Sequence, residues 1–211
     1  MKNAFYTLFA LLLTATFSMA QDDYKVLKTK ADKKKHIRVD VLIPKKLLKK
    51  DYNALAETVK NGLDEKYKKT VVHFFLDGTG PEPFCSAIIG MEKKSMSSRV
   101  NGLPLEREAN FIDESKTPDG ATRKGRWLDE HKGTFIWWYE QGDEMTMAIR
   151  ETLVKSAKVA STKLVTVTIG GEDRYMMRDA DPHLKPYYIL QDDGAIGYYE
   201  QEKLVRVFSI R

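Results

Sequence analysis

Residues 133–151 read GTFIWWYEQGDEMTMAIRE, with two runs rich in apolar residues on either side of Gln141-Gly142-Asp143. Two such runs around a glycine-containing turn are typical of a β-hairpin. The same plan recurs in residues 163–178, KLVTVTIGGEDRYMMR, and in residues 186–208, PYYILQDDGAIGYYEQEKLVRVF. We therefore expect residues 125–211 to form an antiparallel β-meander of about six to eight strands, either an open sheet or a small half-barrel.

The region before this meander has a different pattern. Residues 36–43, HIRVDVLI, alternate as a half-buried strand does and end at Pro44. Apolar residues spaced as on one face of an amphipathic helix follow this strand. Residues 69–78, KTVVHFFLDG, then form an apolar strand without alternation, which predicts that both of its faces are covered. A further short strand is CSAIIGM, residues 85–91. The apolar face of the expected helix consists of Tyr52, Leu55, Ala56, Val59 and Leu63.

These elements predict an α+β fold, in which an N-terminal β-α-β-β unit over residues 21–100 precedes the meander. Residues 101–124 are rich in polar residues, glycine and proline, and include KTPDGATRKG. We interpret this segment as a surface connection between the two parts.

The first 20 residues, MKNAFYTLFALLLTATFSMA, have the features of a secretory signal peptide. One lysine precedes an apolar run that is shorter than the roughly 20 residues of a membrane span, and small residues precede Gln21. We expect cleavage near Ala20 and export to the periplasm or the medium, with no transmembrane segment in the mature chain.

The charge of the chain is unevenly distributed. From Lys25 to Lys69 there are 15 Lys and Arg residues against 6 Asp and Glu, whereas the whole chain has a net charge of only +5. A basic excess of this kind is typical either of a solvated surface or of a face that attracts an anionic cell-envelope surface or an acidic partner. No nucleic-acid-binding motif accompanies it, so we do not expect nucleic acid as a partner.

One stretch combines reactive residue types. Residues 73–87, HFFLDGTGPEPFCSA, contain His73, Asp77 and Cys85, the only cysteine of the chain. A cysteine nucleophile needs an adjacent base, and that base needs an orienting group. No helix start or known cysteine-protease signature surrounds Cys85, so the stretch is more typical of a strand, a turn and a second strand. A hydrolase or thiol enzyme centred on these three residues is the alternative.

Metal and cofactor motifs are absent from the sequence. The four histidines are scattered, no second cysteine is present, and neither an HExxH motif nor a phosphate-binding glycine loop occurs. We therefore expect no metal site and no cofactor.

Residues 135–139, FIWWY, form the richest aromatic run. On a strand, Trp137 and Tyr139 point to one face and Trp138 to the other. One face is expected to be core, and the other to cover a helix or loop or to bind a glycan or protein. The predicted ligand- or partner-binding residues are Trp137, Trp138 and Tyr139.

Four blocks together carry a family resemblance: residues 43–60, 69–78, 125–130 (GRWLDE) and 187–201 (YYILQDDGAIGYYEQ). In this combination the chain resembles a loosely defined family of uncharacterised bacterial proteins, in which a β-α-β unit precedes a G-x-W strand and an antiparallel meander. The resemblance implies an architecture and assigns no functional residue.

The function that these observations favour is that of an exported, non-enzymatic binding or interaction module. It would use either the aromatic run or the basic region to bind a protein, a glycan or an anionic envelope surface. Two alternatives remain open: the hydrolase or thiol enzyme, and a small barrel that carries an apolar ligand.

Overall fold

The chain is mostly β-structure. The computed structural model describes residues 24–32, 35–63, 66–114, 116–153, 158–180, 183 and 185–210. Strands make up 56% of the structure and helices 11%, so the expected α+β class is wrong. The N-terminal segment expected to be a signal peptide lies outside the described residues. No helix in the described segments is long and apolar enough to span a membrane.

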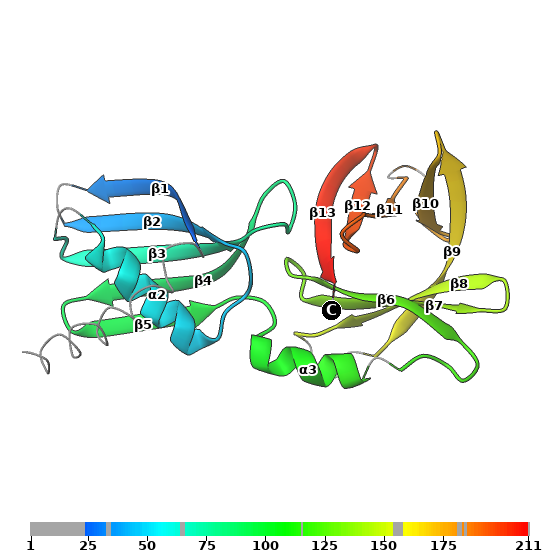
Figure 1. The fold of residues 1–211 in the computed structure, drawn as a ribbon, viewed down its shortest axis with the longest axis horizontal. Helices are drawn as coiled ribbons and strands as arrows, with labels where there is room; N and C mark the ends of the chain where they lie inside the picture. The colour runs from blue at the N-terminus through cyan, green and yellow to red at the C-terminus, as the bar shows by residue number, and fades with distance from the viewer. Residues whose placement is uncertain are drawn as a thin grey trace, which may run out of the picture.

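The N-terminal part is a five-stranded sheet whose strands lie side by side in sequence order, with one helix packed on one face (Figure 1). Strands β2 and β3 are parallel because helix α2 connects them, and the other neighbouring strands are antiparallel. The single β-α-β-β unit expected from the sequence therefore has an additional strand at each edge. The elements are β1 (Lys25–Asp32), β2 (His36–Ile43), α2 (Lys49–Asn61), β3 (Lys69–Leu76), β4 (Phe84–Glu92) and β5 (Ser95–Val100).

Alternation in β2 and β3 places the apolar side chains of this sheet against α2. Val39, Val41 and Phe74 are fully buried there, together with Tyr52 and Ala56 from the helix. The opposite face of β3, which the apolar sequence predicted to be covered, is only half-buried. On this face Val71 lies opposite the charged Arg38 of β2, whereas Phe75 lies opposite Leu42.

The C-terminal part is a closed barrel of eight strands, and this corrects the expected open meander or half-barrel. Neighbouring strands in the sequence pair antiparallel, and β13 closes the barrel on β6 through Ser209 opposite Leu128 and Ile210 opposite Trp127. The strands are β6 (Thr122–Asp129), β7 (Thr134–Gln141), β8 (Glu144–Glu151), β9 (Ala160–Ile169), β10 (Glu172–Met177), β11 (Tyr187–Leu190), β12 (Ile196–Glu200) and β13 (Lys203–Ile210).

Side chains fill the barrel. Trp127 and Trp138 lie in contact at its centre, with ring centroids 4.9 Å apart, and the Trp127 Nε1 donates a hydrogen bond of 2.8 Å to the carbonyl oxygen of Gly194. Gly125 leaves room for this ring, because a Cβ there would lie 2.3 Å from the Trp127 Cη2. The other buried members of this cluster are Ile136, Met147, Leu164, Tyr188, Ile196 and Phe208.

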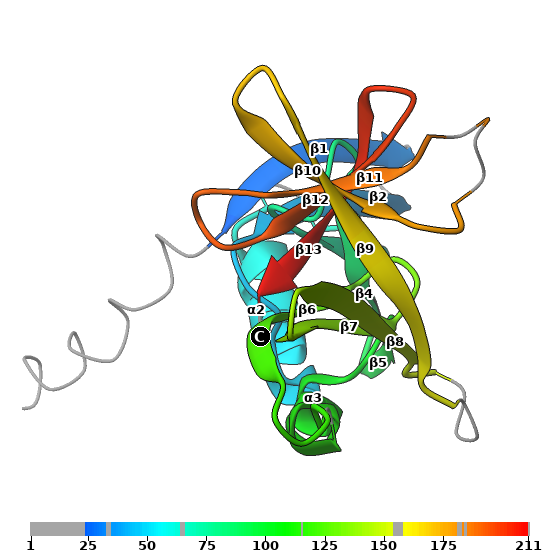
Figure 2. The ribbon, with the colours of Figure 1, turned by 90° about the vertical axis from the view of Figure 1, so that its right-hand side faces the viewer.

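Helix α3 (Leu105–Glu114) lies within the segment that was expected to be a surface connection. It runs along the outside of the barrel below β6, β7 and β8 in both views (Figures 1 and 2). Phe111 packs there against an apolar cluster on the outer face of these strands. The buried members of this cluster are Leu103, Leu128, Phe135, Trp137 and Ala148.

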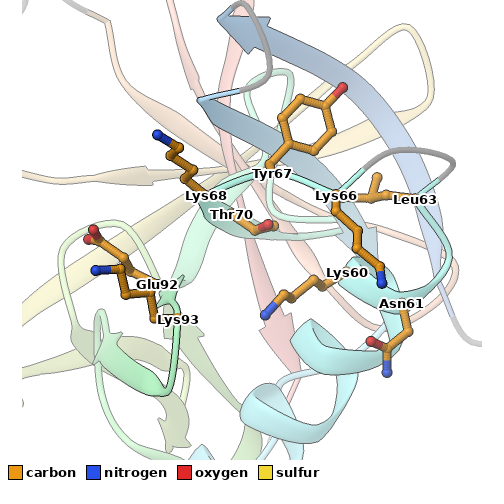
Figure 3. A pocket seen from close by; sticks show the side chains of 9 residues that line it. All are labelled: Lys60, Asn61, Leu63, Lys66, Tyr67, Lys68, Thr70, Glu92 and Lys93. Carbon is orange, nitrogen blue, oxygen red and sulfur yellow. The ribbon is translucent and has the colours of Figure 1, made fainter.

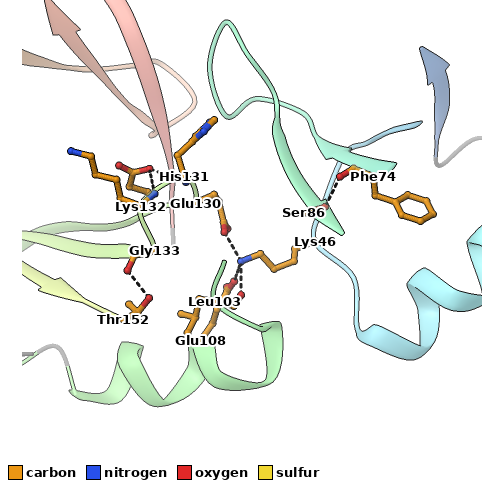
Figure 4. Close-up of polar contacts among 11 residues, drawn as sticks. Lys46, Phe74, Ser86, Leu103, Glu108, Glu130, His131, Lys132, Gly133 and Thr152 are labelled. Atoms are coloured by element: carbon orange, nitrogen blue, oxygen red, sulfur yellow. Dashed lines mark hydrogen bonds and ion pairs between the residues drawn. The ribbon is translucent and has the colours of Figure 1, made fainter. Parts of the chain in front are cut away.

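A buried ionic group joins the sheet to the barrel (Figure 4). The Lys46 Nζ lies 2.5 Å from the Glu108 Oε1 of α3 and 2.6 Å from the Glu130 Oε2 after β6, and it donates to the carbonyl oxygen of Leu103 at 2.9 Å. Nearby, the Val207 N–H of β13 donates to the Thr79 carbonyl oxygen at 3.2 Å. The two parts are therefore held together by directed polar contacts.

Candidate functional site

The predicted reactive trio does not form a catalytic arrangement. His73 lies in the middle of β3, Asp77 follows the end of that strand, and Cys85 lies opposite Phe75 on β4. The Asp77 carboxylate accepts a hydrogen bond from the backbone of Gly78, and the Cys85 thiol donates to the carbonyl oxygen of Ala87 at 3.7 Å. In the part of the chain that the structure describes, no hydrogen bond or ion pair joins the three.

The electrostatic environment also disfavours thiol chemistry. Burial raises the pKa of the Cys85 thiol above its ordinary value, and the nearby Arg38 guanidinium lowers it less. Burial lowers the pKa of His73, and the positive charge of Arg38 lowers it further. Asp40 lies 4.0 Å from the His73 Nδ1, but it is already engaged by Arg38 at 2.6 Å. At neutral pH the thiol is therefore protonated and the imidazole neutral, unlike a thiolate–imidazolium pair.

The predicted aromatic residues divide between two environments. Trp138 points into the barrel, where it contacts Trp127, Tyr175 and Tyr188, and is therefore core. Trp137 and Tyr139 point outward and line a shallow cavity of about 390 Å³ with Pro118 and Ser161. The buried Trp137 Nε1 has no hydrogen-bond partner among the described residues. This side of β7 is the part of the aromatic run that a ligand could approach.

A smaller cavity of about 290 Å³ opens at one end of the barrel. The Asp129–Arg206 ion pair, at 3.3 Å, borders it together with Tyr188 and Tyr198. Burial raises the pKa of both tyrosines. This volume is at the lower limit of about 300 Å³ for small-molecule pockets, and buried apolar and aromatic side chains occupy the barrel beside it.

A cavity larger than these two lies at the other part of the molecule, at the end of the five-stranded sheet (Figure 3). It measures about 720 Å³. Two stretches distant in sequence surround it: the described residues that lead from the C-terminal end of α2 into β3, and the turn between β4 and β5. We call it the lysine pocket, and it is lined by Lys60, Asn61, Leu63, Lys66, Tyr67, Lys68, Thr70, Glu92 and Lys93.

Positive charge dominates the lysine pocket. Among the described residues that line it, four lysines and one glutamate give a net charge of +3. The C-terminal end of α2 adds a partial negative charge of only about half an elementary charge, so it does not reverse the sign. None of the four lysines forms an ion pair with another described residue. Because like charges repel, an anion that enters this space would be attracted and would relieve the repulsion.

Thr70 lies among the lysines. Figure 3 shows it in the middle of the group, with Lys60 and Lys66 on the side of α2 and Lys93 on the side of the β4–β5 turn. Thr70 is 1% exposed, and its hydroxyl has no hydrogen-bond partner among the described residues. Buried hydroxyls in proteins are nearly always hydrogen-bonded, so an unpartnered one beside a basic cavity indicates a place where a ligand oxygen could bind.

The sequence indicated only part of this pocket. The basic excess between residues 25 and 69 includes Lys60, Lys66 and Lys68, but it does not separate them from the other lysines of that region. No sequence pattern pointed to Lys93 or Thr70. Lys93 lies in a hairpin turn, and Thr70 has the pattern of an ordinary strand residue. The described residues contain no group of three or more side chains that could hold a metal ion.

No protein-family model matches the chain, and comparisons with curated proteins and with solved structures give no match either.

Proposed function

We propose that this chain is an exported, non-enzymatic binding module that takes up an anionic group of a cell-envelope component in the lysine pocket. The observation that carries the proposal is the convergence of four lysines, unpaired with other described residues, on one cavity of about 720 Å³. The volume lies within the range of about 300–1,000 Å³ for ligand sites. Its net positive charge gives the anionic class of ligand.

A charge-reversal pair tests this proposal. The double variant Lys66→Glu/Lys68→Glu changes two pocket residues, and the control Lys28→Glu/Lys30→Glu makes the same change in charge at exposed positions on β1. We expect the pocket variant to lose retention on anionic vesicles in moderate salt, while the control retains most of it. Equal loss in both variants would indicate attraction by net charge alone and would contradict a defined site.

The thiol enzyme is the less supported alternative. Its nucleophile would need a lowered pKa, whereas burial raises the pKa of Cys85. We expect an alkylating reagent at neutral pH to modify native Cys85 more slowly than the denatured chain. Modification faster than that of the denatured chain would restore the enzyme hypothesis.

A further inference from the structure

The position of Thr70 narrows the class of ligand. Its side chain lies on the face of β3 that carries Val72, Phe74 and Leu76, all of which are buried and apolar. Its partners on the adjacent strands are Ile37 and Met91, and neither side chain offers it a strong acceptor. Valine has nearly the same shape and would fill this position without burying an unpartnered hydroxyl, so packing alone does not account for threonine.

The lysines narrow the class further. Ammonium groups act as point charges with donors that rotate freely, and they are common ligands of phosphate. A planar carboxylate is matched best by the fork of arginine, and no arginine is among the described residues that line this pocket. A phosphate monoester carries a charge of about −1.5 to −2 at neutral pH, distributed over three oxygens. Four separate ammonium groups match that distribution better than they match a single carboxylate.

From these two observations we infer that the lysine pocket binds a phosphate monoester, with one phosphoryl oxygen accepting a hydrogen bond from the Thr70 hydroxyl. This inference rests on the proposed function. Because Thr70 is 1% exposed, its hydroxyl lies at the base of the pocket, and neighbouring side chains must move aside for that contact. The pocket volume of about 720 Å³ leaves room for the organic group that carries the phosphate.

The turn between β4 and β5 provides a supporting detail. Lys93 has a φ of 51°, a left-handed conformation that glycine or asparagine adopts more readily. A lysine is therefore held at the border of the pocket in a conformation that disfavours it.

The test uses the full chain and two kinds of vesicle of equal surface charge, one with phosphatidic acid, a phosphate monoester, and one with phosphatidylserine. The variants are Thr70→Val, which removes the hydroxyl, and Thr70→Ser, which keeps it. We expect the wild type to prefer phosphatidic acid, Thr70→Val to bind it about fivefold more weakly, and Thr70→Ser to bind nearly as the wild type does. Binding to phosphatidylserine should be weak and equal in all three.

Phenyl phosphate serves as a soluble competitor and identifies the source of the group. If phenyl phosphate displaces the protein from the vesicles, the pocket binds phosphate monoesters in general. If it does not, and Thr70→Val still binds the phosphatidic acid vesicles more weakly, the pocket binds a lipid headgroup. Equal binding of Thr70→Val and the wild type overturns the inference. The proposed function still stands if the Lys66→Glu/Lys68→Glu variant loses retention, whereas absence of binding by the wild type overturns both.

Discussion

The Lys46 ammonium group lies 2.6 Å from the Glu130 carboxylate at the junction between the sheet and the barrel, where the two side chains are only 3% and 0% exposed. A second carboxylate, that of Glu108, lies 2.5 Å from the same nitrogen. Charges removed from water to this degree are stable only while they remain paired. Lys46 therefore holds two buried carboxylates from separate segments against the loop that follows β2.

Removing this lysine should destabilise the junction strongly. We expect Lys46→Met to lower the free energy of unfolding by about 3–5 kcal/mol, because it removes the ammonium group that lies against two buried carboxylates. Chemical denaturation followed by tryptophan fluorescence measures the change. The control is Lys45→Met at the exposed neighbouring position, which should unfold nearly as the wild type does. Equal stability of the two variants would show that the ionic group does not hold the parts together.

Thr70→Val should have opposite effects on stability and on binding. We expect it to raise the free energy of unfolding by about 1 kcal/mol, because it removes a buried hydroxyl without a partner. Thr70→Ser keeps the hydroxyl and should not be stabilised. A loss of stability in Thr70→Val would mean that the hydroxyl is already satisfied in the free protein, and it would remove the main argument for its contact with a ligand.

The barrel should lose stability in alkali. Burial, with a further contribution from Glu202, raises the pKa of Tyr187 to about 12, and burial raises the pKa of Tyr188 and Tyr198 as well. Above pH 10 the unfolded chain therefore releases protons that the folded chain retains, so stability is full below the unfolded pKa of about 10 and falls as pH rises beyond it.

Absorbance of tyrosinate in the ultraviolet checks this expectation. These three phenols should not ionise until the barrel unfolds, and their absorbance should then rise together with the loss of the folded circular dichroism signal. Ionisation of every tyrosine near pH 10 in a protein that is still folded would contradict the burial assigned to them.

Gly125 should not tolerate a side chain. A Cβ at this position would lie 2.3 Å from the Trp127 Cη2 and 2.4 Å from its Cζ2, so Gly125→Ala should lower the free energy of unfolding by about 1–3 kcal/mol through overpacking. The matched control is Gly142→Ala, because Gly142 also lies in the barrel but has no atom near its Cβ direction. The φ of 61° at Gly142 makes that control mildly strained, so the comparison concerns the excess loss at Gly125. Equal losses in both variants would argue against the packing of Trp127.

The hairpins were predicted correctly because their signals are local. β7 ends at Gln141 and β8 begins at Glu144, and Gly142 adopts the left-handed conformation that such a turn requires. Closure of the barrel could not be predicted in the same way. Closure depends on the pairing of β13 with β6, which are about 80 residues apart. No local pattern in either strand specifies the other as its partner.

Helix α3 and the lysine pocket were missed for related reasons. The segment of α3 lies between polar loops, and its helical structure is stabilised by Phe111 and Leu103 packing against the outer face of the barrel, which the sequence does not reveal. The pocket combines the end of a helix, a loop and a hairpin turn. The basic excess between residues 25 and 69 indicated the correct region, but only the fold brings Lys93 to the other side of the cavity.

The central claim is that an anion binds in the lysine pocket and not elsewhere on this basic chain. The most direct measurement is a titration of the isotope-labelled protein with phenyl phosphate, followed by amide chemical shifts in two-dimensional NMR. We expect saturable shifts at Thr70, Lys68 and Lys93, and none at the exposed lysines of β1. Shifts that spread over all basic segments without saturation, or saturable shifts that leave Thr70 unchanged, would contradict the account.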